Sequence, residues 1–154
     1  MKNNIPLNLL ILIISFFNLI SFKTSAQVVE VVGGLSSPYG LAIDQTNHLY
    51  ISQSGSINGN KISFIILNEV NPIISDLFTN LNTPTRLKFS SDGYLYVCES
   101  SATTNRISRA NLGSTTIPIM TPYITGLVTP IGLDIKDNFV FVGDYGSYAI
   151  KKIN

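Results

Sequence analysis

The sequence is poor in the residues on which many enzymes and metal sites depend. It has no tryptophan, one cysteine (Cys98) and one histidine (His48). One cysteine excludes an intrachain disulfide, and we find no zinc-type spacing, serine nucleophile elbow or phosphate-binding glycine-rich loop. A nucleophilic cysteine needs a base beside it, but His48 falls in the polar turn of a different repeat unit. We therefore expect Cys98 to be a small buried residue.

The N-terminal 26 residues have the layout of a secretory signal peptide. Lys2 provides a short charged region, residues 9–17 are apolar apart from one serine, and Thr24-Ser25-Ala26 supplies small residues before a cleavage site. The alternative is an uncleaved anchor helix, which needs about 20 apolar residues, more than this asparagine-interrupted stretch contains. We expect cleavage after Ala26, a secreted or periplasmic mature chain of residues 27–154, and no membrane attachment after cleavage.

Charged residues make up only 12% of the chain, and the formal net charge is +1. Lys2 and Lys23 belong to the segment that we expect to be removed, which leaves eight Lys and Arg side chains against nine Asp and Glu. A nearly neutral chain offers no basic patch for a polyanion, so we expect no nucleic-acid partner.

Three stretches of the chain repeat one pattern, and their prolines, Pro38, Pro84 and Pro130, are 46 residues apart. A fixed period of this size indicates a stack of similar supersecondary units. The three stretches are Gly34–Leu41, Asn80–Leu87 and Gly126–Leu133.

Each unit is predicted to form a small antiparallel sheet. An apolar stretch after the proline, a polar turn such as Asp92-Gly93, and a β-branched and aromatic run predict a β-hairpin. A third strand follows a Gly/Ser/Asn-rich loop, and a weaker fourth strand closes the first two units near 71–77 and 116–124, where prolines favour an edge position. Sustained helical periodicity is absent from the mature sequence. Four antiparallel strands with the innermost first are typical of a β-propeller blade, so the predicted fold class is all-β.

The predicted blades lie near 38–80, 84–126 and 130–154, and the third blade ends after its third strand. Val28–Val32 is predicted as a surplus outer strand ahead of the first blade. Three explanations are open because propellers usually need about 4–8 blades. The chain is part of a longer six-bladed protein, or three blades form an open arc with exposed apolar faces. Alternatively, a homodimer closes a six-bladed ring, each Val28–Val32 strand completing the partner's third blade.

The second unit resembles the NHL-type repeats of six-bladed β-propellers. The residues that carry the resemblance are Phe89-Ser90-Ser91-Asp92-Gly93-Tyr94-Leu95-Tyr96-Val97 and Asn105-Arg106-Ile107. The resemblance covers about residues 34–154 and implies propeller blades. That family contains scaffolds, sensors and a few enzymes, so the fold alone does not give the function. We expect an exported, non-catalytic scaffold that binds a protein, a glycan or a small polar ligand.

The candidate site lies where the loop before each first strand meets the end of the second strand. Gln53, Glu99 and Asp144 hold equivalent positions at the ends of the second strands, and Tyr39 follows the first proline. Arg86 stands where the sister repeats have glycine, and it is a candidate anion ligand. Two interpretations are open: these side chains bind a polar ligand or a cation such as calcium, or they hydrogen-bond to their own loops.

The alternative function is that of a metal-dependent lactone hydrolase, because the unit pattern is also similar to gluconolactonase-like propellers. That resemblance implies a metal held by Glu, Asn and Asp, with the Asn just before a blade's first glycine. The matching positions here are Tyr39, Thr85 and Ile131, none of which is asparagine. Asp144 would match one acidic ligand, and the other ligands would lie on blades that this chain does not contain.

Overall fold

The computed structural model describes residues 26–56, 59–114 and 116–154. The chain divides into two compact units, Met1–Glu30 and Val31–Asn154. Of the first unit, residues 26–30 are described and have no regular secondary structure. The predicted signal peptide therefore lies outside the described residues, apart from its last residue. Within the described part of the chain, no helix has the length and apolar character needed to span a membrane.

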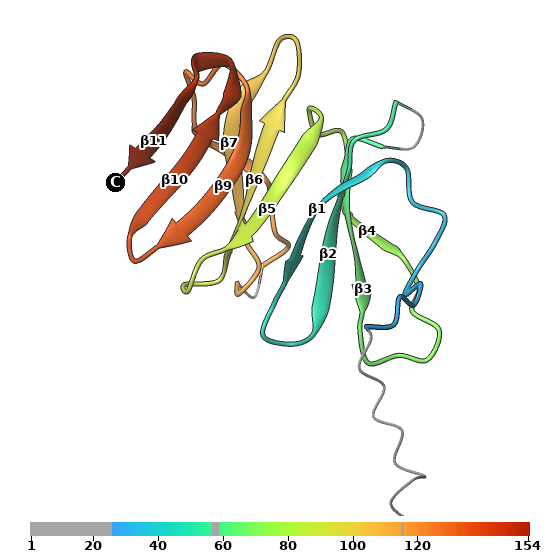
Figure 1. Ribbon diagram of the computed structural model, residues 1–154. Coiled ribbons are helices and arrows are strands. Elements are labelled where there is room, and N and C mark those ends of the chain that lie inside the picture. Colours follow the sequence, from blue (N-terminus) through green and yellow to red (C-terminus); the bar gives the residue numbers. More distant parts are fainter. Residues whose placement is uncertain (1–25, 57–58, 115) are drawn as a thin grey trace, which may run out of the picture. The chain divides into compact units, whose positions relative to one another are not determined.

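The second unit consists of three antiparallel sheets that follow one another along the chain (Figure 1). The first sheet has the order β1 (Pro38–Ile43), β2 (His48–Gln53), β3 (Lys61–Ile66), β4 (Ser75–Phe78). The second has the order β5 (Pro84–Phe89), β6 (Tyr94–Ser100), β7 (Asn105–Asn111), β8 (Thr121–Ile124). The third contains β9 (Pro130–Lys136), β10 (Phe139–Asp144) and β11 (Ala149–Ile153), with the short 3-10 helix η1 (Tyr145–Ser147) before β11. The predicted all-β fold with three propeller-type blades is confirmed.

The outer strands differ from the prediction in two ways. β4 and β8 are only four residues long, so Pro72 and Pro118 precede them, while Pro122 lies in β8 at the sheet edge, where a missing N–H is tolerated. Val28–Val32 forms no strand in the single chain, and its pairing with a closing blade or a second copy stays a prediction. A strand forms only when a neighbouring strand pairs with its backbone. For Val28–Val32 the expected neighbour belongs to a closing blade or to a second copy.

The hydrophobic core lies between successive sheets and uses equivalent positions at each joint. Ile62 of the first sheet and Ile107 of the second are fully buried, and each faces the next sheet along the chain. Leu87 and Leu133 pack in the opposite direction, against the preceding sheet. Each sheet thus uses one apolar face for the sheet after it and the other for the sheet before it.

Hydrogen bonds across the joints set how closely the sheets approach. Ser52 Oγ accepts from the Gly40 N–H at 2.7 Å and donates to the carbonyl of Thr85, in the next sheet, at 2.5 Å. Ser54 Oγ donates to the carbonyl of Pro84 in the same joint. A Cβ at position 40 would overlap the Thr85 carbonyl oxygen, so this close approach requires glycine at Gly40.

Ile107→Ala should lower the free energy of unfolding by about 2–4 kcal/mol, because it removes buried contacts and leaves a cavity between the second and third sheets. Urea denaturation measures this change. The matched control is Ile117→Ala, in the β7–β8 loop, where the side chain is 88% exposed and the expected change is within about 0.5 kcal/mol. Equal losses in the two variants would contradict the packing described for Ile107.

Candidate binding site at the loop end of the sheets

One buried side chain at the end of each second strand holds the leading loop of its sheet, meaning the loop just before the first strand. Gln53 Oε1 accepts from the Ser36 N–H at 2.7 Å, and Glu99 Oε2 accepts from the Asn82 N–H at 2.8 Å. Asp144 accepts from the backbone N–H groups of Val128 at 3.0 Å and Thr129 at 2.6 Å. All three acceptors are almost completely buried. Each leading loop is therefore fixed by its own sheet.

The same three side chains also bind the third strand of their sheet. Gln53 Nε2 donates to Ser63 Oγ at 2.7 Å, and Ser108 Oγ donates to Glu99 Oε1. Lys151 Nζ, at the equivalent place on β11, donates to Asp144 Oδ2 at 2.6 Å. We call this repeated arrangement the strand-end clamp. It joins the leading loop, the second strand and the third strand.

The clamp contains a charge pair in the second and third sheets, and the first sheet places its charge elsewhere. Arg106 donates to both oxygens of Glu99, at 2.8 and 3.2 Å. Gln53 is neutral, and in its sheet Asp76 on β4 accepts from Ser63 at 2.7 Å and from Lys61 at 3.0 Å. In the first sheet the acidic group therefore lies on the fourth strand instead of the second.

The clamp carboxylates are held in their charged form. Burial raises the pKa of Glu99, but hydrogen bonds from Arg106, Ser108 and the Asn82 backbone outweigh burial and lower it. Burial likewise acts against ionisation of Asp144, and its hydrogen bonds, that of Lys151 foremost, still bring its pKa down to about 2. Their oxygens are directed into their own sheets. In the described part of the chain no group of three or more His, Cys, Asp and Glu side chains is placed to hold a metal ion.

Tyr39 and Arg86 are arranged differently, because both are exposed. The register of β1 and of β5 shifts just after the proline, so that two residues oppose one on the neighbouring strand. Such a bulge redirects side chains. The Arg86 guanidinium carbon lies 5.9 Å from the centre of the Tyr39 ring, and no carboxylate of the described residues lies within ion-pair distance of Arg86.

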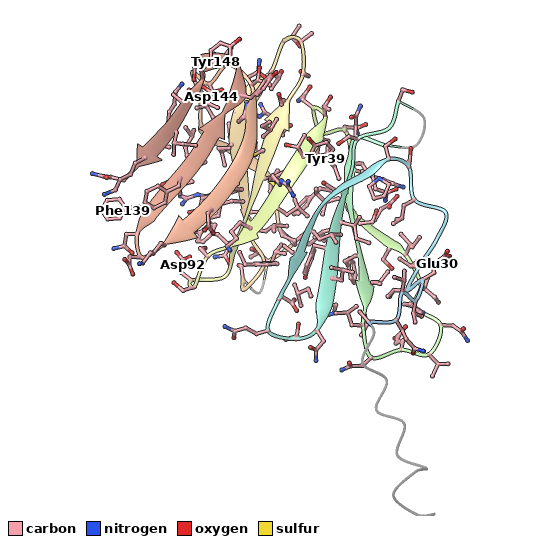
Figure 2. All side chains as sticks on the ribbon, in the orientation of Figure 1. Glu30, Tyr39, Asp92, Phe139, Asp144 and Tyr148 are labelled. Atoms are coloured by element: carbon pink, nitrogen blue, oxygen red, sulfur yellow. The ribbon has the colours of Figure 1, made fainter. Side chains whose placement is uncertain are left out.

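A hollow of about 460 Å³ lies beside Arg86 on the third sheet. Its other lining residues are Ile131, Gly132, Gly143, Asp144, Tyr145, Tyr148, Ala149 and Ile150. The side chain of Tyr148 is 93% exposed, and its ring lies 6.3 Å from that of Tyr145. Figure 2 shows Tyr148 at the same end of the third sheet as Asp144, whereas Phe139 lies toward the other end. The hollow therefore combines an exposed cation with two exposed aromatic rings.

The two tyrosines of this hollow were not among the sequence candidates. They lie in the short turn between β10 and β11, where the first sheet has a loop rich in serine, glycine and asparagine and the second has serine, alanine and threonine. The signal in the sequence was this substitution of aromatic residues for polar ones. It was hidden because the shorter third loop breaks the alignment of the repeats.

Cys98 and His48 occupy structural positions. Burial raises the pKa of the Cys98 thiol to about 12, and its sulfur lies 3.8 Å from the Gly132 carbonyl in the next sheet. His48 starts β2, at the strand end opposite Gln53, with its Nδ1 2.7 Å from Thr46 Oγ1 and 3.1 Å from Asp44. Neither residue lines the hollow beside Arg86.

Comparison with known proteins supports the fold. No family model and no curated protein matches the sequence. Virginiamycin B lyase from Staphylococcus aureus is similar in structure, with a TM-score of 0.58 and 22% identity over 77% of this chain and 38% of that one. A catalytically inactive histidine variant of the same lyase, solved with quinupristin, gives a TM-score of 0.59, with the same identity and coverage.

A nidogen/laminin complex gives a TM-score of 0.57 and 20% identity over 75% of this chain. The chain spans less than half of these structures, 38% of the lyase and 42% of the chain in the complex. At this identity the similarity establishes the β-propeller fold.

Asp144→Asn should destabilise the protein at pH 7 by about 2 kcal/mol. A carboxyl whose pKa falls from 3.8 to about 2 on folding stabilises the fold above pH 4 and loses that contribution as the pH drops toward 2. The loss of stability between pH 4 and pH 2 should therefore be smaller in the variant than in the parent protein. Urea denaturation across this range gives both values.

The control for this experiment is Asp137→Asn, at an exposed turn position whose positive φ asparagine also tolerates. Its stability should follow the parent protein at every pH. If the Asp144 variant and the parent lost equal stability on acidification, the role assigned to this carboxylate would be wrong.

Proposed function

We propose that this chain is an exported β-propeller segment that acts as a binding scaffold, with no catalytic activity of its own. The observation that carries the proposal is that, at the loop end of the sheets, the described acidic side chains are paired and the Arg86 side chain is not. Glu99 and Asp144 are fully engaged in strand-end clamps, whereas Arg86 is exposed and has no carboxylate partner among the described residues. The groups that remain available there suit recognition.

The chemistry of the hollow favours a ligand that carries a carboxylate. A guanidinium binds a carboxylate through two parallel N–H donors, which gives both affinity and orientation. Tyr145 and Tyr148 add flat apolar surfaces with hydroxyl groups, and Tyr39 flanks the guanidinium. An acidic glycan, an acidic protein segment and a small organic acid share this carboxylate, and each fits the proposed scaffold role.

The structural neighbours include both classes of function. They include a complex of nidogen with laminin and a lyase that is catalytically inactive in a histidine variant. The single histidine of this chain is engaged with Asp44 and Thr46 at the opposite end of β2. This placement supports the binding role over a lyase-like one. The residue pattern of the second blade supports our assignment of the repeats to the NHL type.

The second candidate function, a metal-dependent lactone hydrolase, would need about three protein ligands around one metal. Asp144, the residue that matched an acidic ligand, is bound to Lys151 and to its leading loop. A lactone-hydrolysis assay with calcium or zinc separates the two functions. Metal-dependent turnover would overturn the scaffold proposal.

The proposed export is tested by the N-terminus of the protein after secretion. Cleavage after Ala26 predicts that the exported chain begins at Gln27. Mass spectrometry of the protein recovered from the periplasm or the medium measures this directly. An exported chain that still began at Met1 would contradict the proposal.

Arg86→Gln should weaken binding of a carboxylate ligand at least about tenfold, since a hydrogen bond to a charged group contributes about 1.5–3 kcal/mol. The probes are trigalacturonate, a glutamate-rich peptide and glutarate, with neutral maltotriose for comparison, and titration calorimetry measures affinity. Lys136→Gln is the control, because it removes an exposed cation at the other end of the sheet. Failure of all three acidic probes to bind, or equal weakening by both substitutions, would overturn the assignment of Arg86.

A further inference from the structure

The third sheet presents to solvent the apolar face that the first two sheets bury. We call the face of a sheet that packs on the following sheet its forward face. Ile62, Ile107 and Ile150 occupy equivalent positions on the three forward faces, opposite the equivalent residues Ser52, Cys98 and Gly143 of the second strands. Ile62 and Ile107 are 0% exposed, but Ile150 is 77% exposed. The forward face of the third sheet therefore carries the isoleucine that is buried at the other two joints, but no following sheet packs on it among the described residues.

The first sheet presents the complementary half of the same joint. Leu41 and Ile43 on β1 correspond to Leu87 and Phe89 on β5, which pack against the preceding sheet. Leu41 is 61% exposed and Ile43 is 57% exposed, whereas Leu87 is 5% exposed. One chain thus exposes the inner-strand part of this second half-joint, while Ile51 and Ile65 on the same face are buried in the single chain.

The edge of the third sheet is also available for pairing. β3 pairs with β4, and β7 pairs with β8, whereas β11 has no outer neighbour among the described strands. Residues 29–32 precede β4 by the same 46 residues that separate β4 from β8. Val29–Val32 therefore holds the position of a fourth strand in the repeat, but forms no strand in the single chain.

The side chains at that position match the apolar character of β11. In the first sheet Ser63 lies opposite Asp76, and Ile62 lies opposite Phe78. The same register places Glu30 opposite Lys151, and Val32 opposite Ile150. Glu30 would then be a second carboxylate beside Lys151, whose Nζ already lies 2.6 Å from Asp144 Oδ2, and a valine would cover the exposed isoleucine. The apolar pairing favours this register over one displaced by a single residue.

We propose that Val29–Val32 of one copy pairs with β11 of a second copy as its fourth strand. Leu41 and Ile43 of the first copy then cover the forward face that contains Ile150 in the second. Such a contact joins two different surfaces, so it forms a closed assembly when the second copy returns the same contact. The recognition mode is addition of a strand to an exposed sheet edge. Ile150 also lines the hollow beside Arg86, so this contact borders the proposed ligand site.

The test is the mass in solution of the protein purified as expressed from its full sequence, measured by light scattering on a sizing column over a range of concentrations. We expect a dimer at micromolar concentration. Ile150→Asp, which places a charge on the receiving face, and Val32→Pro, which removes a donor and disfavours the strand, should each lower the association constant at least tenfold. The control is Ile117→Asp, which adds the same charge at another exposed isoleucine and should leave the dimer intact.

A mixing experiment distinguishes loss of the contact from loss of the fold. The Ile150→Asp protein keeps an intact donor segment, and the Val32→Pro protein keeps an intact receiving sheet. Mixing the two should restore one contact and give a heterodimer, although neither variant self-associates well. A monomer in the parent protein at 100 micromolar (about a hundredfold above the expected range), association that survives both substitutions, or no complementation on mixing would overturn the proposal.

Discussion

The arrangement of the sheets depends on the strand-end clamp, in which a buried acceptor ties a leading loop to two strands. A buried carboxylate without partners would be costly, and here each carboxylate receives donors from the backbone of its leading loop and from side chains of the third strand. The clamp sets where the first strand begins and therefore where the bulge after each proline falls. The exposed positions of Tyr39 and Arg86 follow from that bulge.

The joints between sheets have a different physical origin. They are apolar contacts supplemented by a few hydrogen bonds to backbone carbonyls, such as that from Ser52 to Thr85. Because each sheet contacts mainly the sheets next to it, stability resembles a sum over sheets and their joints. The end sheets are therefore the parts of the fold with the fewest packing partners.

The 46-residue period and the alternation of turns with β-branched runs were enough to predict the sheets and the equivalence of Gln53, Glu99 and Asp144. The sequence did not reveal which way these side chains point, because that depends on strand register and on a bulge that inserts one residue after the proline. Tyr145 and Tyr148 were not predicted for a related reason: their loop is shorter than the equivalent loop of the first sheet, so these two repeats do not align there. Val28–Val32 is not a strand in the single chain because strand formation depends on a partner as well as on propensity.

The first sheet has an amide, Gln53, where the other two sheets have an acid, and this difference has a consequence for how the repeats diverge. The amide at Gln53 coexists with Asp76 on the fourth strand, while Glu99 coexists with proline at the corresponding place, Pro122. A single substitution at either place would leave a cation unpaired or bring two acids together. Sequence drift at these positions should therefore proceed by compensating exchanges between the second and fourth strands, whereas position 86, outside the clamp, can change alone. Duplicated blades would keep a common frame in this way while each acquires its own surface chemistry.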